Sequence, residues 1–366
     1  MSYTNGLDDP SAHFQTALWT GDGTAGNAVT FDGNSDMQPD MVWSKRRDVG
    51  YSHVLKDTSR GGTSDNDLNL VPNLANAEST YAAYRMDFNS DGFTLDGVGD
   101  SGFQGSGTSM VSWCWKANGG STSSNTDGTG ITSTVQANQD AGFSIVTYTG
   151  IGSGNANPSV GHGLGVTPQV VLVKSRSQAI SWIMYHYGID GANSRNKYLL
   201  LDTTGAAGTL GNYWGTSGSG GVTSSTFGVY ADNQSANNYL NGTHVAYCFA
   251  EKQGYSKFGK YVGNGSTNGS FIYTGFKPAV VITKKRDQVS NWTIYDNKRD
   301  PFNVADKVLL PNANNADQTV INFDFVSNGF KCRNSGSENE NGTTFIYMAF
   351  AENPFTTSTG IPTTAR

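Results

Sequence analysis

Three stretches of the chain that share one pattern decide the fold: PDMVWSKRRD (residues 39–48), PQVVLVKSRS (residues 168–177) and PAVVITKKRD (residues 278–287). In each stretch a lysine follows the proline by six positions and an arginine follows it by eight. The residues between them are apolar and often β-branched, which is typical of a buried strand that begins after a proline turn. One strand pattern thus occurs three times, which indicates three copies of one domain.

Further elements surround each proline stretch in the same order. A strand with alternating aromatic residues precedes the proline, and an aromatic strand and a leucine-rich strand follow it. Each copy closes on a strand with alternating large residues. These closing strands read WCWKA, YCFAE and MAFAE at residues 113–117, 247–251 and 348–352. Roughly five to eight short strands in each copy, separated by turn signals and without a long amphipathic helix, predict a two-sheet β-sandwich or jelly roll.

We therefore predict an all-β protein of three tandem, divergent β-sandwich domains with a jelly-roll-like fold, joined by short linkers. The three repeats are placed at residues 1–118, 141–253 and 254–355. The first two prolines are farther apart in sequence than the second and the third. Residues 119–140, whose Gly/Ser/Thr/Asn-rich composition predicts a linker, explain that difference. Residues 356–366 are expected to form a C-terminal tail.

The composition indicates a folded, turn-rich chain and argues against two classes of function. Glycine supplies 46 of the 366 residues, and aromatic residues make up 11%, which is too many for a disordered chain. The net charge is −6, and the chain has no long basic stripe, which disfavours nucleic-acid binding. No apolar run approaches the roughly 18 residues of a membrane span, so we expect no membrane insertion.

The residues that could carry chemistry do not have the spacing of a known site. None of the five histidines lies in an HxH or HExxH pattern, and neither a GxSxG elbow nor a P-loop is present. The Asp/Asn/Gly cluster at residues 87–92 is expected to form Asx turns rather than a calcium loop. Three cysteines far apart in sequence are expected to be buried free thiols: Cys114, Cys248 and Cys332. We expect no catalytic residue, no metal site and no cofactor.

Polar and aromatic residues that recur around the proline strands are the candidates for ligand binding. Two interpretations of the lysines and arginines stay open. They are solvated residues at the strand exit that pair with nearby aspartates, or they contact an anionic partner such as a surface polysaccharide or an acidic virion subunit. The tryptophans of the following strand are either core residues or platforms for sugar rings. The candidates are Lys174, Arg176, Trp182, Lys284, Arg286 and Trp292.

Several segments resemble structural and tail-fibre-type proteins of tailed bacteriophages that infect marine bacteria, including cyanobacteria. The segments are DDPSAHFQT (residues 8–16), DGNSDMQPDMVW (residues 32–43), WCWKA (residues 113–117), YDNKRD (residues 295–300) and YMAFAENPF (residues 347–355). The resemblance covers almost the whole chain, apart from the first residues, the linker and the tail. Because such proteins are mostly identified only as structural or tail-fibre proteins, it carries over no catalytic residue.

The resemblance implies a non-enzymatic virion structural protein, a tail-fibre or surface-appendage component that contributes to assembly and host attachment. The alternatives are a capsid decoration protein, a glycan-binding lectin module and, last, a polysaccharide depolymerase, which would need two carboxylates close together. The expected partners are other virion proteins and a host cell-surface glycan. By analogy with phage fibres we expect a homo-oligomer, a trimer, although three copies in one chain could also be pseudo-threefold by themselves.

The expected location is the virion, at the tail or on the capsid surface, after synthesis in the host cytoplasm. The N-terminal sequence MSYTNG (residues 1–6) lacks the basic and apolar regions of a signal peptide. Delivery outside the cell is therefore expected to follow lysis or assembly into a particle.

Overall fold

The structure, a computed structural model, describes residues 7, 9–61, 67–99, 102–216 and 221–353. Antiparallel strands dominate it and its helices are short turns, so the prediction of an all-β, sandwich-type fold is confirmed. No helix in this described part is long and apolar enough to cross a membrane. The expected C-terminal tail, residues 356–366, lies outside the described residues.

Each repeat contains four antiparallel strands in one shared order, which we call its inner sheet. In the first repeat the order is β1 (Phe14–Thr20), β9 (Ser109–Trp115), β3 (Met41–Arg46) and β4 (Val54–Asp57). In the second it is β12 (Phe143–Thr149), β19 (Thr243–Phe249), β14 (Val170–Ser175) and β15 (Ile183–His186). In the third it is β20 (Ser256–Val262), β27 (Thr344–Phe350), β22 (Val280–Lys285) and β23 (Trp292–Asp296).

The strand registers make the three inner sheets equivalent residue by residue. The proline stretches form β3, β14 and β22, and each of these strands lies beside the closing strand of its repeat. The first residue of each proline strand pairs with the same position of the closing strand, which holds Trp115, Phe249 and Phe350. Every residue of these strands therefore has a counterpart in the other two repeats.

Each inner sheet is covered on its outer face by further elements of its own repeat. The outer sheets are β2 (Asn27–Val29), β8 (Phe93–Leu95) and β7 (Met86–Phe88) in the first repeat, β13 (Ser159–Gly161) and β18 (Thr226–Gly228) in the second, and β21 (Phe271–Tyr273), β26 (Gly329–Cys332), β25 (Gln318–Val326) and β24 (Ala305–Val308) in the third. Shorter strands are β5 (Leu68–Asn69) and β6 (Ser79–Thr80) in the first repeat, and β16 (Lys197–Leu200) and β17 (Gly208–Thr209) in the second. The helical turns are η1 (Pro10–Ala12), α1 (Thr58–Gly61), η2 (Ala82–Tyr84), η3 (Gly152–Gly154), η4 (Gly191–Asn196) and η5 (Ser337–Asn339).

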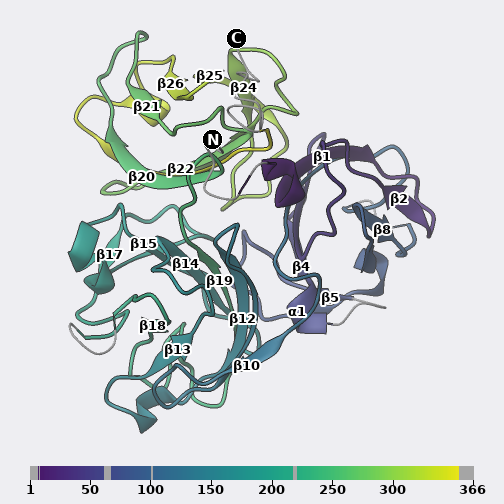
Figure 1. The fold of residues 1–366 in the computed structure, drawn as a ribbon. Helices are drawn as coiled ribbons and strands as arrows, with labels where there is room; N and C mark the ends of the chain where they lie inside the picture. The colour runs from purple at the N-terminus through teal and green to yellow at the C-terminus, as the bar shows by residue number, and fades with distance from the viewer. Residues whose placement is uncertain (1–6, 8, 62–66, 100–101, 217–220, 354–366) are drawn as a thin grey trace.

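Both faces of each inner sheet are buried. The outer face packs on the outer elements and forms a separate core in each repeat. The inner face meets the other two inner sheets in a central core that draws apolar residues from all three repeats (Figure 1). The closing strands are accordingly buried at every position except the first. The repeats are thus not a string of separate domains but three lobes around one pseudo-threefold axis.

An aromatic triad marks this axis. The rings of Trp115, Phe249 and Phe350, one from each closing strand, have centroids 5.4 to 6.2 Å apart. Such separations are within the range of attractive edge-to-face pairs. Next to the triad lies an apolar cavity of about 20 Å³, lined by side chains of all three repeats. A space of this size holds about one water at most, so the axis is a packed core and not a channel.

Residues 119–140 are not a linker, and that prediction was wrong. They contain β10 (Ser123–Asn125) and β11 (Ser133–Asn138), which extend the inner sheet of the second repeat beyond β12. Their composition misled because serine and threonine serve as well in a strand at a sheet edge as in a flexible segment. The buried Gln136 of β11 donates to the hydroxyls of Thr58 and Ser59, so the hairpin also holds the first repeat to the second.

Candidate functional site

The two candidate tryptophans, for which both a core role and sugar stacking were open, are buried between repeats. Trp182 is 0% exposed and Trp292 is 1% exposed, so the alternative of core residues is correct for both. The indole N–H of Trp182 donates to the carbonyl of Val71 in the first repeat at 3.0 Å. That of Trp292 donates to the carbonyl of Leu200 in the second repeat at 2.9 Å. Neither ring is available to stack on a ligand.

A histidine completes the same set of contacts in the first repeat. By strand register, His53 takes the place of Trp182 and Trp292. Its Nε2 lies 3.0 Å from the carbonyl of Leu310 in the third repeat, and its Nδ1 accepts the indole N–H of Trp43 at 2.9 Å. Burial lowers the pKa of His53 to about 3, so the ring is neutral and Nε2 is the donor. One ring N–H therefore reaches one backbone carbonyl at each of the three contacts between repeats, which we call junctions.

The candidate lysines do not face solvent either. Lys174 and its counterparts Lys45 and Lys284 are at most 1% exposed. The Nζ of Lys174 donates to the carbonyl of Ser175 at 2.7 Å, and Nζ of Lys284 donates to that of Lys285 at 3.0 Å. Burial lowers the pKa of all three lysines to about 8. The interpretation as solvated or partner-binding lysines was wrong, because their ammonium groups donate hydrogen bonds to backbone carbonyls inside the fold.

The arginines that follow these lysines reach into the neighbouring repeat. Arg176 pairs with Glu78 of the first repeat at 2.7 Å, and its counterpart Arg47 pairs with Asp317 of the third at 2.9 Å. Arg286 donates to the carbonyl of Ile189 in the second repeat at 2.9 Å and also binds Asp287. The acidic partner expected for this pattern is therefore part of the same chain.

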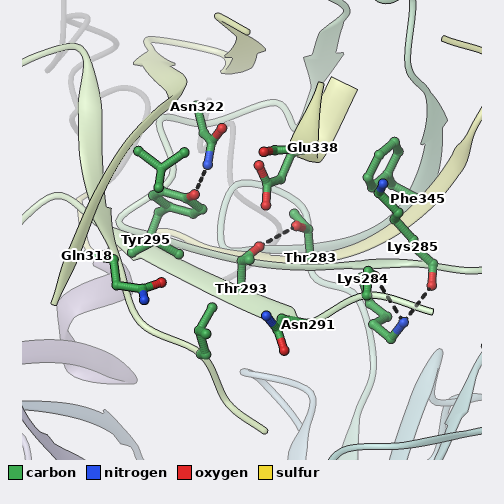
Figure 2. A pocket seen from close by; sticks show the side chains of 15 residues that line it. Thr283, Lys284, Lys285, Asn291, Thr293, Tyr295, Gln318, Asn322, Glu338 and Phe345 are labelled. Carbon is green, nitrogen blue, oxygen red and sulfur yellow. Dashed lines mark hydrogen bonds between the residues drawn. The ribbon is translucent and has the colours of Figure 1, made fainter. Parts of the chain in front are cut away.

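A polar cavity in the third repeat remains as the candidate site. It encloses about 310 Å³ between the outer face of the inner sheet and strands β24 and β25. Its floor contains the buried side chains of Thr283, Thr293 and Glu338, and exposed residues such as Asn291 and Gln318 form its rim (Figure 2). The hydroxyls of Thr283 and Thr293 lie 2.8 Å apart. The Tyr295 hydroxyl at the other side of the floor accepts from the amide of Asn322.

Glu338 is the unusual group of this cavity. Its side chain points from η5 toward the threonine pair (Figure 2), and the residue is 7% exposed. Its Oε2 is buried and has no hydrogen-bond partner among the described residues. Burial raises the pKa of Glu338 to about 7, against the smaller opposing effects of hydrogen bonds from its own backbone N–H and from Thr293 and of the charge of Lys285. A buried carboxyl oxygen without a partner costs free energy, so its retention needs an explanation.

The other two repeats show what this position normally holds. In each repeat a glycine with positive φ donates its N–H to the backbone carbonyl of one residue before the closing strand: Gly23 to Gln104, Gly152 to Asn238 and Gly265 to Asn339. The residue immediately before that acceptor is Phe103 in the first repeat, Asn237 in the second and Glu338 in the third. Glu338 is thus the counterpart of a phenylalanine and an asparagine.

Both counterparts are accommodated within the fold. Phe103 is fully buried and packs edge-on against Trp19, with ring centroids 5.7 Å apart. The side-chain oxygen of Asn237 accepts from Tyr230 at 3.1 Å and from Ser235 at 2.7 Å, and its amide donates to Tyr213 at 3.3 Å. Only the third repeat places an acid here, with an open space in front of it.

The sequence analysis did not single out Glu338. The signal was present, because the residues before the closing strands can be aligned on the same spacing, but three short loops of unlike sequence give no reason to compare them. The three cysteines are buried free thiols as predicted. Among the described residues, no group of three or more His, Cys, Asp or Glu side chains is placed to hold a metal ion.

Comparisons with known proteins identify a family but no function. No curated protein and no solved structure matches the chain. A family model described as "Domain of unknown function (DUF7483)" matches residues 9–354, which covers all three repeats and the hairpin between the first two. Because this match spans nearly the whole chain, the protein belongs to the DUF7483 family.

Proposed function

We propose that the protein is a non-enzymatic structural component of a tailed-phage particle, a part of a tail fibre or surface appendage that serves assembly and host attachment. The observation that supports this proposal is the closed arrangement of three repeats around one core. The arginine and tryptophan candidates join the repeats, and the lysine candidates are buried against backbone carbonyls, which leaves a compact body with loops on three lobes. Several similar surfaces on one rigid body suit attachment by repeated weak contacts.

The candidate cavity favours binding over catalysis. Glycoside hydrolysis generally requires two carboxyl groups that flank the scissile bond. Glu338 is the only acid among the described residues that line the cavity. Glycan binding is therefore a second candidate function, favoured by the unpartnered carboxyl oxygen, and depolymerase activity has no such support.

The test is to locate the chain in purified virions by immunogold labelling or subunit-resolved cryo-electron microscopy. Density at the tail or its fibres supports the proposal and an attachment role. Density on the capsid contradicts the fibre assignment and indicates a decoration protein. Absence of the chain from particles contradicts the structural role altogether.

The pseudo-threefold arrangement also bears on the oligomeric state. In a homotrimeric fibre, three chains each supply one sheet to a shared axis, and here a single chain supplies all three. We propose that one chain takes the place of such a trimer, so that the isolated protein sediments with the 38.9 kDa mass of a monomer. A sedimentation-equilibrium mass three times larger would instead support the trimer expected by analogy with phage fibres.

A further inference from the structure

Glu338 is held firmly in a position that gains nothing for the fold. The amide of the next residue, Asn339, donates to Asn264 Oδ1 at 2.9 Å, to the Ser266 carbonyl at 2.7 Å and to the Asn334 carbonyl at 2.8 Å. The Tyr261 hydroxyl donates to the carbonyl of Glu338 itself at 2.8 Å. The backbone of the turn is therefore fixed at the acid and at the residue that follows it. Such rigidity lowers the cost of ordering a bound ligand.

The surrounding groups define the chemistry of a ligand. Glu338 Oε2 can accept a hydrogen bond, and the threonine hydroxyls and the Asn322 amide can take part in others. An anionic ligand would be repelled by the carboxylate. Lys285 also lines the cavity, and its positive charge disfavours a cationic ligand. The floor therefore suits a neutral molecule with several hydroxyl groups.

Size and shape narrow the class further. A volume of about 310 Å³ lies at the lower end of the range of about 300 to 1,000 Å³ for small-molecule sites. Tyr295 and Phe345 also line the cavity but are at most 1% exposed, and amide side chains stand at its exposed rim. Fixed polar groups in the floor and amide groups at the rim suit the hydroxyl edge of one sugar ring.

We propose that the cavity of the third repeat is a binding site for one neutral sugar residue, whose hydroxyl group donates a hydrogen bond to Oε2 of Glu338. The proposal rests on the second candidate function, glycan binding, and names one neutral sugar residue as the ligand, and it does not depend on where in a particle the chain is located. It also explains why the third repeat departs from the pattern of the other two, since the ligand supplies the missing partner.

The test measures binding of single sugars to the full chain by isothermal titration calorimetry and saturation-transfer NMR. The probes are the methyl α- and β-glycosides of glucose, galactose, mannose and N-acetylglucosamine. At least one of them is expected to bind the unaltered protein, and Glu338→Gln is expected to weaken that binding by about tenfold, because a hydrogen bond to a charged acceptor is replaced by a weaker bond to a neutral amide oxygen. Absence of binding by every glycoside, or equal binding by the variant, would overturn the proposal.

Two further variants make the result specific. Glu251→Gln neutralises a partly exposed acid of the second repeat that pairs with Lys257, and it is expected to leave sugar binding unchanged. Thr283→Val introduces the residue that the second repeat has at this register, Val173, and is expected to fold normally while weakening binding. If Glu338→Gln failed to fold, retention of full affinity by Thr283→Val would still contradict the site.

The pH dependence of binding provides a second readout. Because the pKa of Glu338 is about 7, sugar affinity should rise about eightfold from pH 6 to pH 7.5 as the carboxylate forms. The other titratable groups that face Glu338 are Tyr261, Tyr295, Cys332 and Lys285. Burial raises the pKa of both tyrosines and of Cys332, so these groups stay neutral in this range. An end point of 7.5 also avoids the titration of Lys284 near pH 8. Glu338→Gln should abolish the rise, and a rise that survives in this variant would contradict the assigned role.

Discussion

The junction between the first and second repeats and the junction between the second and third share a backbone frame but not their buried side chains. In both, a tryptophan N–H reaches a carbonyl of the neighbouring repeat. In both, a backbone N–H donates at 2.8 Å to the carbonyl of the arginine after the proline strand: from Glu78 to Arg176 in one and from Ala207 to Arg286 in the other. The third and first repeats are joined by the same bond, in which the backbone N–H of Asp317 donates to the carbonyl of Arg47.

The side chains around this frame differ in kind. The junction of the first and second repeats buries a charged network, in which Arg60 pairs with Asp57 at 2.5 Å and with Glu78 at 2.6 Å, and Tyr247 donates to Asp57. The third and first repeats have the same network, formed by Asp296, Arg299 and Asp317. At the junction of the second and third repeats the corresponding residues are His186, Ile189 and Ala207.

This difference teaches that the backbone bonds, and not the ion pairs, define how two repeats meet. One junction has lost two acids and an arginine and still forms every shared backbone contact. Its histidine donates to the Tyr347 carbonyl across the junction at 3.1 Å. Buried ion networks often contribute little net stability over well-packed apolar residues, although breaking one is costly.

The largest effect is expected from breaking a charged junction at its centre. Arg60→Ala leaves the carboxylates of Asp57 and Glu78 without their shared cation in a buried site. We expect a loss of about 3 to 5 kcal/mol in the free energy of unfolding, measured by guanidinium denaturation. Arg46→Ala, which removes a more exposed pair with Asp48, serves as the control and should cost less than about 1 kcal/mol. Similar losses in the two variants would show that the network does not stabilise the junction.

A smaller loss of stability is expected when the tryptophan-to-carbonyl bond is removed, and it should be the same at the charged and at the uncharged junction. Trp182→Phe and Trp292→Phe each remove an indole N–H and leave a buried carbonyl without its donor. Each should lower the free energy of unfolding by about 2 kcal/mol, because the lost bond and the reduced packing are the same. Thermal and chemical denaturation of both variants provides the comparison. Losses that differ by more than about 1 kcal/mol would mean that the ion network changes the effect of losing the tryptophan bond.

Acid should weaken the uncharged junction through His186. Burial lowers the pKa of His186 to about 4, while the unfolded chain takes up this proton near the ordinary value of 6.5. Because this pKa is lower in the folded state than in the unfolded state, the free energy of unfolding decreases as the pH falls from about 6.5 to about 4. The contribution is about 1.5 kcal/mol between pH 6.5 and pH 5. In His186→Gln, the loss of unfolding free energy between pH 6.5 and pH 5 should be smaller by this amount. An unchanged loss would exclude His186 as a source of acid sensitivity.

The smallest effect is expected when one junction is converted into the other. Asp57→His, Arg60→Ile, Glu78→Ala and Tyr247→Met together introduce the residues of the junction between the second and third repeats, Met348 being the counterpart of Tyr247. Arg176 already has Nη2 3.4 Å from the carbonyl of residue 60, which matches the bond of Arg286 to Ile189. The quadruple variant should therefore be within about 1 kcal/mol of the unaltered protein. A loss as large as that of Arg60→Ala would show that the two junctions are not interchangeable.

The sequence predicted the strands better than their surroundings. The proline stretches and closing strands lie where the repeat placed them, because strand identity depends on local pattern. It did not reveal that Cys114 and Trp113 face two different cores, since a small residue beside a large one also fits a strand with one exposed face. Nor could it reveal that Lys174 is buried, because its partners are backbone carbonyls. Every residue has such a carbonyl, so no residue type in the sequence indicates the contact. Glu338 is recognisable only beside Phe103 and Asn237, once the glycine turns align the three loops.

The contact between the first and last repeats has a consequence for chain connectivity. Phe14 of β1 stacks on Phe350 of β27 with centroids 5.6 Å apart, and the Thr16 N–H donates to Glu352 at 3.2 Å. The first and last strands are thus neighbours, and their junction carries the same ring-to-carbonyl bond as the two that the chain crosses. A circular permutant that joins these strands by a short peptide and opens the chain between two other repeats would keep every contact of the fold. The three repeats form a closed ring with equivalent contacts at each junction, so the chain could be opened between any two repeats with the same fold.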